Sequence, residues 1–237
     1  NFYLAYNGVK SIVMLFNVRA LHIKIMNNEN QTIHKSDDNL AIYGWNEKLN
    51  QLKQESIYSA LAHGRVSIVH RTCYEVISGN GLFQCELTGN MMYGKSDDEL
   101  PCTDDWVIFQ PFDEHKGIIV DSLPRERTLY RKKSGTVADK QAIASYVDKA
   151  FIVQSLDDNF NVRRVERFMV QIMEENISSV LVLNKADLEF DRQSVEEQIK
   201  HISSQIPVFF TSIHQLETMV RLRKSISEGE TVVFVGS

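Results

Sequence analysis

Alternating apolar strands and helices in the second half of the chain restrict its fold more than any other feature. Residues 150–153, 179–183, 208–210 and 231–235 are short apolar runs rich in β-branched residues, typical of strands buried on both faces. Between them, apolar side chains at helical spacing predict helices at residues 162–173, 195–202 and 216–226. From residue 134 onward we therefore predict an α/β domain with a parallel sheet and ligands at the carboxyl ends of the strands.

The first half of the chain has a different pattern. Short strands are predicted at residues 65–69, 72–77, 82–87, 106–109, 117–120 and 128–130. The second and third are joined by Ser78-Gly79-Asn80-Gly81, a composition that favours a tight hairpin turn. Five or six short strands within roughly 70 residues predict a small OB-like β-barrel, preceded by a loosely helical segment at residues 45–61.

Composition excludes several classes of protein. The 237 residues are 43% apolar and 24% charged with a net charge of -5, which is globular rather than disordered. The cysteines Cys73, Cys85 and Cys102 have neither disulfide-framework nor zinc-ligand spacing, so we expect a reducing compartment and no metal site in this chain. No apolar run approaches the ~20 residues that span a bilayer. We expect a soluble, cytoplasmic monomer with no membrane partner.

The two ends of the chain carry their own hypotheses. Residues 1–38 lack clean periodicity and include the polar run Asn27-Asn28-Glu29-Asn30-Gln31, so we interpret them as a poorly structured or non-native leader, with a native start at or after Met26. A genuine extra strand or helix is the alternative. The predicted domains are then residues 39–133, the barrel with its lead-in, and residues 134–237, a partial α/β domain.

The tetrapeptide Asn184-Lys185-Ala186-Asp187 follows the apolar strand at residues 179–183, where an α/β sheet places ligand contacts. A carboxylate at Asp187 can accept the ring imino and exocyclic amino protons of guanine together, a donor pair that adenine does not present. The stem of Lys185 can lie along the base, and the amide of Asn184 can either hold neighbouring loops together or meet the acceptor edge of the base. A polar turn with Asp187 as a helix cap is the alternative.

The dipeptide Thr211-Ser212 follows the next strand along the chain. The backbone N–H of Ser212 could meet the guanine carbonyl oxygen, although a Thr-Ser pair after a strand is also a common helix cap. We therefore predict a guanine-binding set of Asn184, Lys185, Asp187 and Ser212. At the far end, the strand at residues 231–235 leads into Gly236-Ser237, which is how a phosphate-binding loop begins.

From about residue 39 onward the chain resembles the ribosome small-subunit-dependent GTPases, the RsgA or YjeQ type. The matching stretches are Leu100-Pro101-Cys102-Thr103-Asp104-Asp105-Trp106-Val107, Leu123-Pro124-Arg125-Glu126-Arg127, Arg131-Lys132-Lys133, Asp158-Asn159-Phe160-Asn161, Arg163-Arg164-Val165-Glu166-Arg167-Phe168, Asn184-Lys185-Ala186-Asp187 and Phe234-Val235-Gly236-Ser237. Two departures stand out. Asp104 occupies a position where the family usually has glycine, and Ile213 replaces the usual small residue after Ser212.

The resemblance implies an OB fold that binds ribosomal RNA, followed by a circularly permuted GTPase domain in which the guanine motif precedes the phosphate loop. It implies GTP or GDP with Mg²⁺ as ligands of the complete protein, a zinc site confined to a further C-terminal domain, and a role in late maturation of the small ribosomal subunit. The phosphate-loop lysine and its magnesium ligand would follow Ser237. We therefore expect this chain to hold no catalytic residue and to lack measurable GTP hydrolysis.

The basic residues Arg125, Arg127, Arg131, Lys132 and Lys133 form a local cluster near the end of the predicted barrel. They are either a solvated surface turn or a contact to the phosphate backbone of ribosomal RNA, whose strength would fall steeply with salt. Arg65 and Arg71 could extend the same surface.

Two alternative functions stay open. One is a non-catalytic RNA-binding OB module that carries a degenerate nucleotide-binding fold. The other is a permuted GTPase that acts on the large ribosomal subunit, against which the predicted barrel argues.

Overall fold

The computed structural model describes residues 3–4, 12–17, 38–132, 140–227 and 229–236 of the chain. The chain forms two compact units. One, the α/β unit, comprises residues 1–18 and 147–237, and the other, the barrel unit, comprises residues 19–146. The division between the units falls between Tyr146 and Val147.

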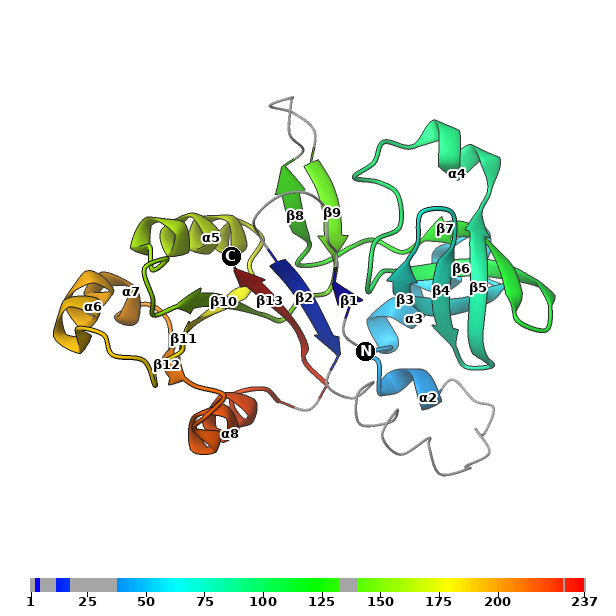
Figure 1. Ribbon diagram of the computed structural model, residues 1–237. Helices are drawn as coiled ribbons and strands as arrows, with labels where there is room; N and C mark the ends of the chain where they lie inside the picture. Colours follow the sequence, from blue (N-terminus) through cyan, green and yellow to red (C-terminus); the bar gives the residue numbers. More distant parts are fainter. Residues whose placement is uncertain (1–2, 5–11, 18–37, 133–139, 228, 237) are drawn as a thin grey trace. The chain divides into compact units, whose positions relative to one another are not determined.

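The α/β unit is built on the parallel strands β10 (Lys149–Ser155), β11 (Ser178–Asn184), β12 (Val208–Thr211) and β13 (Thr231–Gly236). They lie side by side in the order β13-β10-β11-β12, visible in Figure 1. Strands β10 and β11 are the central pair and are buried along most of their length, which explains their continuous apolar sequence. The parallel sheet confirms the predicted α/β class.

Helices cover both faces of this sheet, with α5 (Val162–Glu174) and α8 (Leu216–Lys224) on opposite sides in Figure 1. Helix α5 starts at Asn161, whose side chain accepts a hydrogen bond from the Arg164 N–H at 3.2 Å. Helix α8 packs Leu222 into a core with Phe151, Val180 and Val232. The helix predicted at residues 195–202 is instead two short helices, α6 (Arg192–Gln198) and α7 (Lys200–Ser203), because the backbone of Ile199 between them leaves helical geometry, with φ -95° and ψ 3°.

Part of the predicted leader lies in the described residues. Strand β2 (Ile12–Asn17) pairs antiparallel with β13, and β1 (Tyr3–Leu4) pairs antiparallel with β2. The polar run from Asn27 to Gln31 lies outside the described residues, as does the predicted domain boundary at residues 133 and 134. The predicted leader and domain limits therefore stay predictions.

The barrel unit contains a closed barrel of β3 (Ala62–Val69), β4 (Tyr74–Ser78), β5 (Gly81–Leu87), β7 (Lys116–Ser122) and β6 (Trp106–Asp113), in that spatial order. Strand β6 pairs with β3 and closes the barrel, and β5 and β7 run parallel while the other neighbours are antiparallel. Helix α4 (Gly89–Gly94) lies in the connection from β5 to β6. This arrangement confirms the predicted OB-like barrel.

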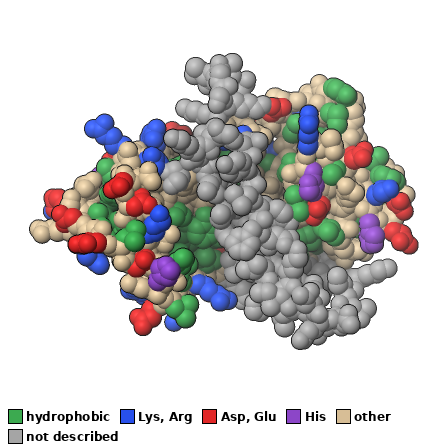
Figure 2. Space-filling view, in the orientation of Figure 1, with side chains coloured by type: hydrophobic (Ala, Val, Ile, Leu, Met, Phe, Trp, Pro, Cys, Tyr) green, Lys and Arg blue, Asp and Glu red, His purple; other side chains and the backbone are tan. Residues whose placement is uncertain are grey.

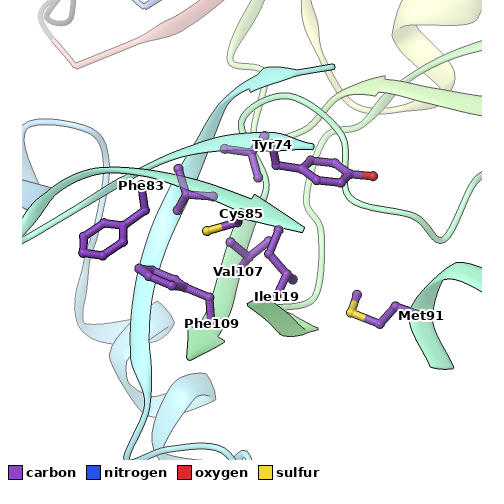
Figure 3. Close-up of a cluster of buried hydrophobic side chains, with 9 residues drawn as sticks. Tyr74, Phe83, Cys85, Met91, Val107, Phe109 and Ile119 are labelled. Carbon is purple, nitrogen blue, oxygen red and sulfur yellow. The ribbon is translucent and has the colours of Figure 1, made fainter. Parts of the chain in front are cut away.

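Inward-facing side chains from all five strands fill the barrel. Figure 3 shows Phe83 and Phe109 close together, with ring centroids 5.1 Å apart, beside Cys85 and Ile119. Met91 of α4 joins the same cluster and is almost fully buried. A second cluster joins the lead-in helices α2 (Asp38–Ala41) and α3 (Glu47–Glu55) to the barrel, and its buried members are Leu40, Leu49, Trp106, Ile108 and Leu123.

One predicted barrel strand lies elsewhere. The segment predicted at residues 128–130 forms β8 (Leu129–Lys132), which pairs antiparallel with β9 (Lys140–Ala144) in a separate two-stranded sheet. Of the five or six barrel strands predicted, five form the barrel, and the segment at residues 128–130 is not one of them. The barrel closes through β6 and β3, and this closure leaves no edge for β8.

Asp104, the residue that replaces the family's usual glycine, adopts a φ of 69°. This is the left-handed region, which glycine enters freely and aspartate less easily. The Asp104 carboxylate lies 3.3 Å from Nε of the buried Arg65, and Arg65 Nε also donates to the Asp104 carbonyl at 3.2 Å. Arg65 is therefore buried, beside Trp106 and the lead-in segment, where its guanidinium also donates to the Tyr43 carbonyl, and the hypothesis that it extends an RNA-binding surface was wrong.

Candidate functional site

The predicted nucleotide-binding residues lie where three parallel strands end. Ser155 at the end of β10 is in register with Asn184 at the end of β11, and Asn184 is in register with Thr211 at the end of β12. Side chains that follow these positions are therefore brought to one edge of the sheet. In this fold class, the carboxyl edge of the strands is where ligands bind.

Asn184 joins the neighbouring loops, as predicted from its amide. Its Oδ1 accepts a hydrogen bond from the Thr211 hydroxyl at 3.3 Å, and its backbone carbonyl accepts one from the Leu156 N–H at 2.8 Å. The next loop is held in the same way, because the Ala186 N–H donates to the Thr211 carbonyl at 3.0 Å. The three strand ends therefore form one hydrogen-bonded unit.

Lys185 adopts a left-handed backbone conformation with a φ of 63°. Its Nζ lies 2.7 Å from Oδ2 of Asp157, and its side chain is 51% exposed. Asp157 also accepts hydrogen bonds from the Ser155 hydroxyl at 2.7 Å and from the Asn159 N–H at 3.0 Å. These contacts, that of Lys185 first, hold the pKa of the Asp157 carboxyl well below its usual value.

Asp187 presents an exposed carboxylate two residues after Lys185. A hydrogen bond from Ser212 lowers the pKa of this carboxyl, so the group stays ionised at neutral pH. An ionised carboxylate has only acceptor oxygens. It therefore matches a ligand edge that carries two adjacent N–H donors, which is the edge that guanine presents.

Ser212 is fully buried, and its polar groups are bound within the chain. Its backbone N–H donates to Oγ1 of Thr218 at 3.0 Å, and its hydroxyl oxygen accepts a hydrogen bond from the His214 N–H at 3.0 Å. The structure therefore gives the Ser212 N–H a different partner from the guanine carbonyl that we predicted. The next residue, Ile213, has a side chain that is 76% exposed and lies at the rim of the same loop.

Gly236 ends strand β13 in register with Val153 of β10. A Cβ atom at this position would lie 2.5 Å from the Val153 carbonyl oxygen, closer than any side chain can approach. Glycine is therefore required here by the close approach of two strands. Ser237, the second residue of the predicted phosphate-loop start, lies outside the described residues.

Arg125, the first residue of the predicted RNA-binding cluster, is committed to contacts inside the barrel unit. Its guanidinium makes a bidentate ion pair with Asp105, with Nη2 2.7 Å and Nε 3.0 Å from the carboxylate, and also donates to the carbonyls of Asp98 and Leu100. Asp105 is completely buried and Arg125 is 15% exposed. Such a guanidinium has few donors left for an RNA phosphate.

The remaining basic residues lie on or next to the hairpin of β8 and β9. Arg131 donates to Gln141 at 3.0 Å across the hairpin, and Nζ of Lys140 lies 5.4 Å from the centre of the Tyr130 ring. Arg127 lies 3.4 Å from the carboxylate of its neighbour Glu126. The side chain of Lys132 and all of Lys133 lie outside the described residues. In Figure 2, basic and acidic side chains are interspersed over the visible faces of both units.

In the part of the chain that the structure describes, no three His, Cys, Asp or Glu side chains come together in a way that could hold a metal ion. None of the helices among the described residues is long and apolar enough to cross a membrane.

Two residues of the site were not found from the sequence. Asp157 follows the end of β10, and the rule that ligand contacts gather at the ends of parallel strands could have identified it. Thr218 lies within α8, six residues beyond Ser212, and nothing in the local sequence indicates that its hydroxyl accepts the Ser212 N–H. The contact is visible only in the folded structure, where the loop after Ser212 brings Thr218 back to it.

Sequence comparison identifies similar proteins for most of the chain. A family model described as RsgA GTPase matches residues 122–237. The small ribosomal subunit biogenesis GTPase RsgA 1 of Bacteroides thetaiotaomicron is 66% identical over 212 residues, which are 90% of this chain and 58% of that protein. The small ribosomal subunit biogenesis GTPase RsgA of Methanosarcina acetivorans is 32% identical over 222 residues, with the same two shares. The chain thus spans 58% of the length of either relative.

Structural comparison finds the same overall fold in two solved proteins. YjeQ from Thermotoga maritima matches with a TM-score of 0.54 and 21% identity, over 70% of this chain and 57% of that one. YloQ, described as a circularly permuted GTPase, matches with a TM-score of 0.52 and 16% identity, over 76% of this chain and 72% of that one. At these identities the likeness establishes the fold alone.

Proposed function

Because this chain belongs to the RsgA GTPase family, we propose that it supplies the guanine-binding site and an RNA-binding barrel of a GTPase for small ribosomal subunit biogenesis. The chain spans 58% of the length of its Bacteroides relative. We therefore propose GTP hydrolysis, a magnesium ion and binding to the small ribosomal subunit for the complete protein, of which this chain supplies the two sites named above. The observation that carries the guanine site is the exposed, ionised carboxylate of Asp187 at the carboxyl edge of the sheet.

Three groups of this chain would contact the base. Asp187 accepts hydrogen bonds from the imino and amino protons of guanine, and the stem of Lys185 lies along one face of the ring. The Ser212 N–H is donated to Thr218, so we assign the guanine carbonyl oxygen to the backbone N–H of Ile213, the next residue of the loop. Asn184 keeps the loops together through Thr211 and Leu156.

The substitution Asp187→Asn tests this assignment in the 237-residue chain. An asparagine amide has one acceptor and one donor, so it no longer matches the two donors of guanine but does match the imino proton and the neighbouring carbonyl of xanthine. We expect guanosine affinity to fall about 10-fold to 100-fold, and xanthosine affinity to rise above that of the wild type. Calorimetric titration of guanosine, xanthosine and adenosine measures all three affinities.

The matched control is Glu189→Gln, which removes an exposed carboxylate two residues further along the chain. It should leave the order of the three affinities unchanged. If the wild-type chain does not distinguish guanosine from adenosine, or if Asp187→Asn and Glu189→Gln behave alike, Asp187 does not read guanine.

For the barrel unit, we propose that the hairpin of β8 and β9 contacts ribosomal RNA through Arg131, Lys132, Lys140 and the ring of Tyr130. Arg127 and Lys133 of the predicted cluster belong to the same proposal. Arg125 is left out of this contact, because its guanidinium is bound to the buried Asp105. Two observations support this proposal. Several basic residues lie close together in this hairpin, although the chain as a whole has a net charge of -5. The Bacteroides relative is described as a GTPase of small ribosomal subunit biogenesis.

The double substitution R131A/K132A tests this proposal against purified small ribosomal subunits. Each lost phosphate contact should lower affinity at low salt and reduce the slope of log affinity against log salt by about one. Lys95→Ala, which removes a positive charge next to α4, is the control and should keep the wild-type slope. An unchanged slope in R131A/K132A would exclude these two residues from the RNA contact.

A further inference from the structure

Asp157 lies beside the proposed base-binding lysine although 28 residues separate them in sequence. Strand β10 ends at Ser155, which is in register with Asn184, and the Leu156 N–H donates to the Asn184 carbonyl at 2.8 Å. The segment after β10 is thus tied by its backbone to the loop that begins at Asn184. This connection places the Asp157 carboxylate 2.7 Å from Nζ of Lys185.

The Asp157 carboxylate is held in place from two other directions. Its Oδ2 accepts a hydrogen bond from the Ser155 hydroxyl at 2.7 Å, and its Oδ1 accepts one from the Asn159 N–H at 3.0 Å. The Asp157 side chain is 24% exposed, against 51% for Lys185. The Asp157 carboxylate is therefore held by more contacts than the ammonium group of Lys185, and it can fix the position of that group.

Lys185 gains from such a partner because its side chain is long. A free lysine loses much conformational entropy when a ligand fixes it, and that loss weakens binding. The backbone of Lys185 lies in the left-handed region. Two hydrogen bonds hold it there: the Ala186 N–H donates to the Thr211 carbonyl, and the Leu188 N–H donates to the Lys185 carbonyl. Asp157 fixes the ammonium group at the other end of the side chain. Only the methylene stem of Lys185 then loses freedom when the base binds.

We propose that Asp157 is a positioning residue, which orients Lys185 so that its stem lies along the face of the base before the nucleotide binds. The inference rests on the proposed guanine site. It predicts a contribution that acts through the base and is independent of the phosphates. A carboxylate that acted only through its negative charge would instead oppose binding of the phosphates.

The substitution Asp157→Asn separates these two effects in the 237-residue chain. Asparagine keeps the size of the side chain and an acceptor but removes the charge that holds Lys185. We expect guanosine and GDP affinities to fall by the same factor, about threefold to tenfold, as for an exposed charged pair that pre-orders a ligand contact. A residue that acts only through its charge would give tighter GDP binding with guanosine unchanged, and that result would overturn the proposal.

Asp158→Asn is the matched control, since it removes the neighbouring exposed carboxylate. It should change both affinities less than twofold, on the order of the scatter of exposed surface substitutions. A double-mutant cycle with Lys185→Met adds a readout that a general structural role would not produce. If Asp157 acts through Lys185, Asp157→Asn has no further effect on affinity once Lys185 is methionine.

A nucleotide-free measurement keeps the two proposals apart. Acetylation of Lys185 by acetic anhydride, followed by peptide mass spectrometry, should be faster in Asp157→Asn than in wild type or Asp158→Asn, because the ion pair protects the amine. Equal rates, or Asp157→Asn affinities equal to those of Asp158→Asn, would overturn the role of Asp157 alone. A wild-type chain that binds guanosine no better than adenosine would overturn the guanine site and this role with it.

Discussion

At the scale of single residues, the function of a charged side chain depends on where its partners lie. Arg125 and Arg131 are both arginines of one basic stretch. Arg125 forms an ion pair with the buried Asp105, while Arg131 bonds across a two-stranded hairpin. Removing the partner of a buried charge is costly, whereas an arginine on a hairpin surface is not needed to offset a buried charge. The first arginine therefore supports the fold, and the second is available to the proposed RNA contact.

Arg125→Ala should destabilise the barrel unit by about 3–5 kcal/mol, because it leaves the fully buried Asp105 without its guanidinium. Urea unfolding measures this through tryptophan fluorescence, since Trp45 and Trp106 both lie in that unit. The double variant R125M/D105N removes both charges and should recover part of the loss. Arg131→Ala should stay within about 0.5 kcal/mol of wild type. A small effect of Arg125→Ala would return this residue to the candidate RNA contacts.

At the scale of elements, the candidate site depends on how closely parallel strands approach at their carboxyl ends. Strands β10 and β13 run in register to Val153 and Gly236, and there the second strand has no room for a Cβ atom. Strand β13 therefore ends directly beside β10 near the carboxyl end of the sheet. Ser155, the last residue of β10, and Asp157 in the segment after it follow Val153 closely, so Gly236 lies near the candidate site along the chain of β10.

Gly236→Ala should push β13 away from β10 and destabilise the α/β unit by about 2 kcal/mol, as overpacking between two backbones does. Hydrogen exchange followed by mass spectrometry should show faster exchange in peptides from β10 and β13. The same substitution at Gly89, where a Cβ atom would meet nothing within 4 Å, is the control and should leave exchange unchanged. Unaltered exchange in Gly236→Ala would contradict the close approach of the two strands.

At the scale of the whole molecule, the chain is two compact units with different ionic supports. In the α/β unit, Lys149 at the start of β10 forms an ion pair with Glu230, which precedes β13, at 2.8 Å. Burial raises the pKa of Glu230, but hydrogen bonds from Lys149 and the Ser227 N–H outweigh it, and the pKa is lowered. This stabilisation is complete above the unfolded pKa of about 4.5 and is lost as pH falls through the lowered value.

Glu230→Gln should therefore reduce the acid sensitivity of the α/β unit. We expect the wild type to be more stable than the variant by less than about 1 kcal/mol at pH 7, and this difference to shrink as the pH falls below about 4.5 and to disappear below the lowered pKa of Glu230. Hydrogen exchange in β10 and β13 measures it as a function of pH, and tryptophan fluorescence should show no change in the barrel unit. Glu197→Gln, on the exposed side of α6, is the control. An equal difference at pH 7 and pH 3 would exclude the ion pair as its source.

The sequence by itself determined the class of each unit and the place of the main motif. Apolar runs and helical periodicity are local properties, so they located β10, β11, α5 and β13, and the Gly79-Asn80 turn located the hairpin of β4 and β5. The motif from Asn184 to Asp187 was found at a strand end because both the strand and the motif are continuous in sequence.

Only the tertiary structure decided which groups these residues meet. It showed that β8 pairs with β9 rather than entering the barrel, that Arg125 binds Asp105, that the Ser212 N–H bonds to Thr218, and that Asp157 holds Lys185. Strand pairing and side-chain partners depend on groups that are distant along the chain, and a barrel that closes through other strands has no place for one more. A local sequence pattern does not show which distant groups come together, so these contacts could not be predicted from the sequence.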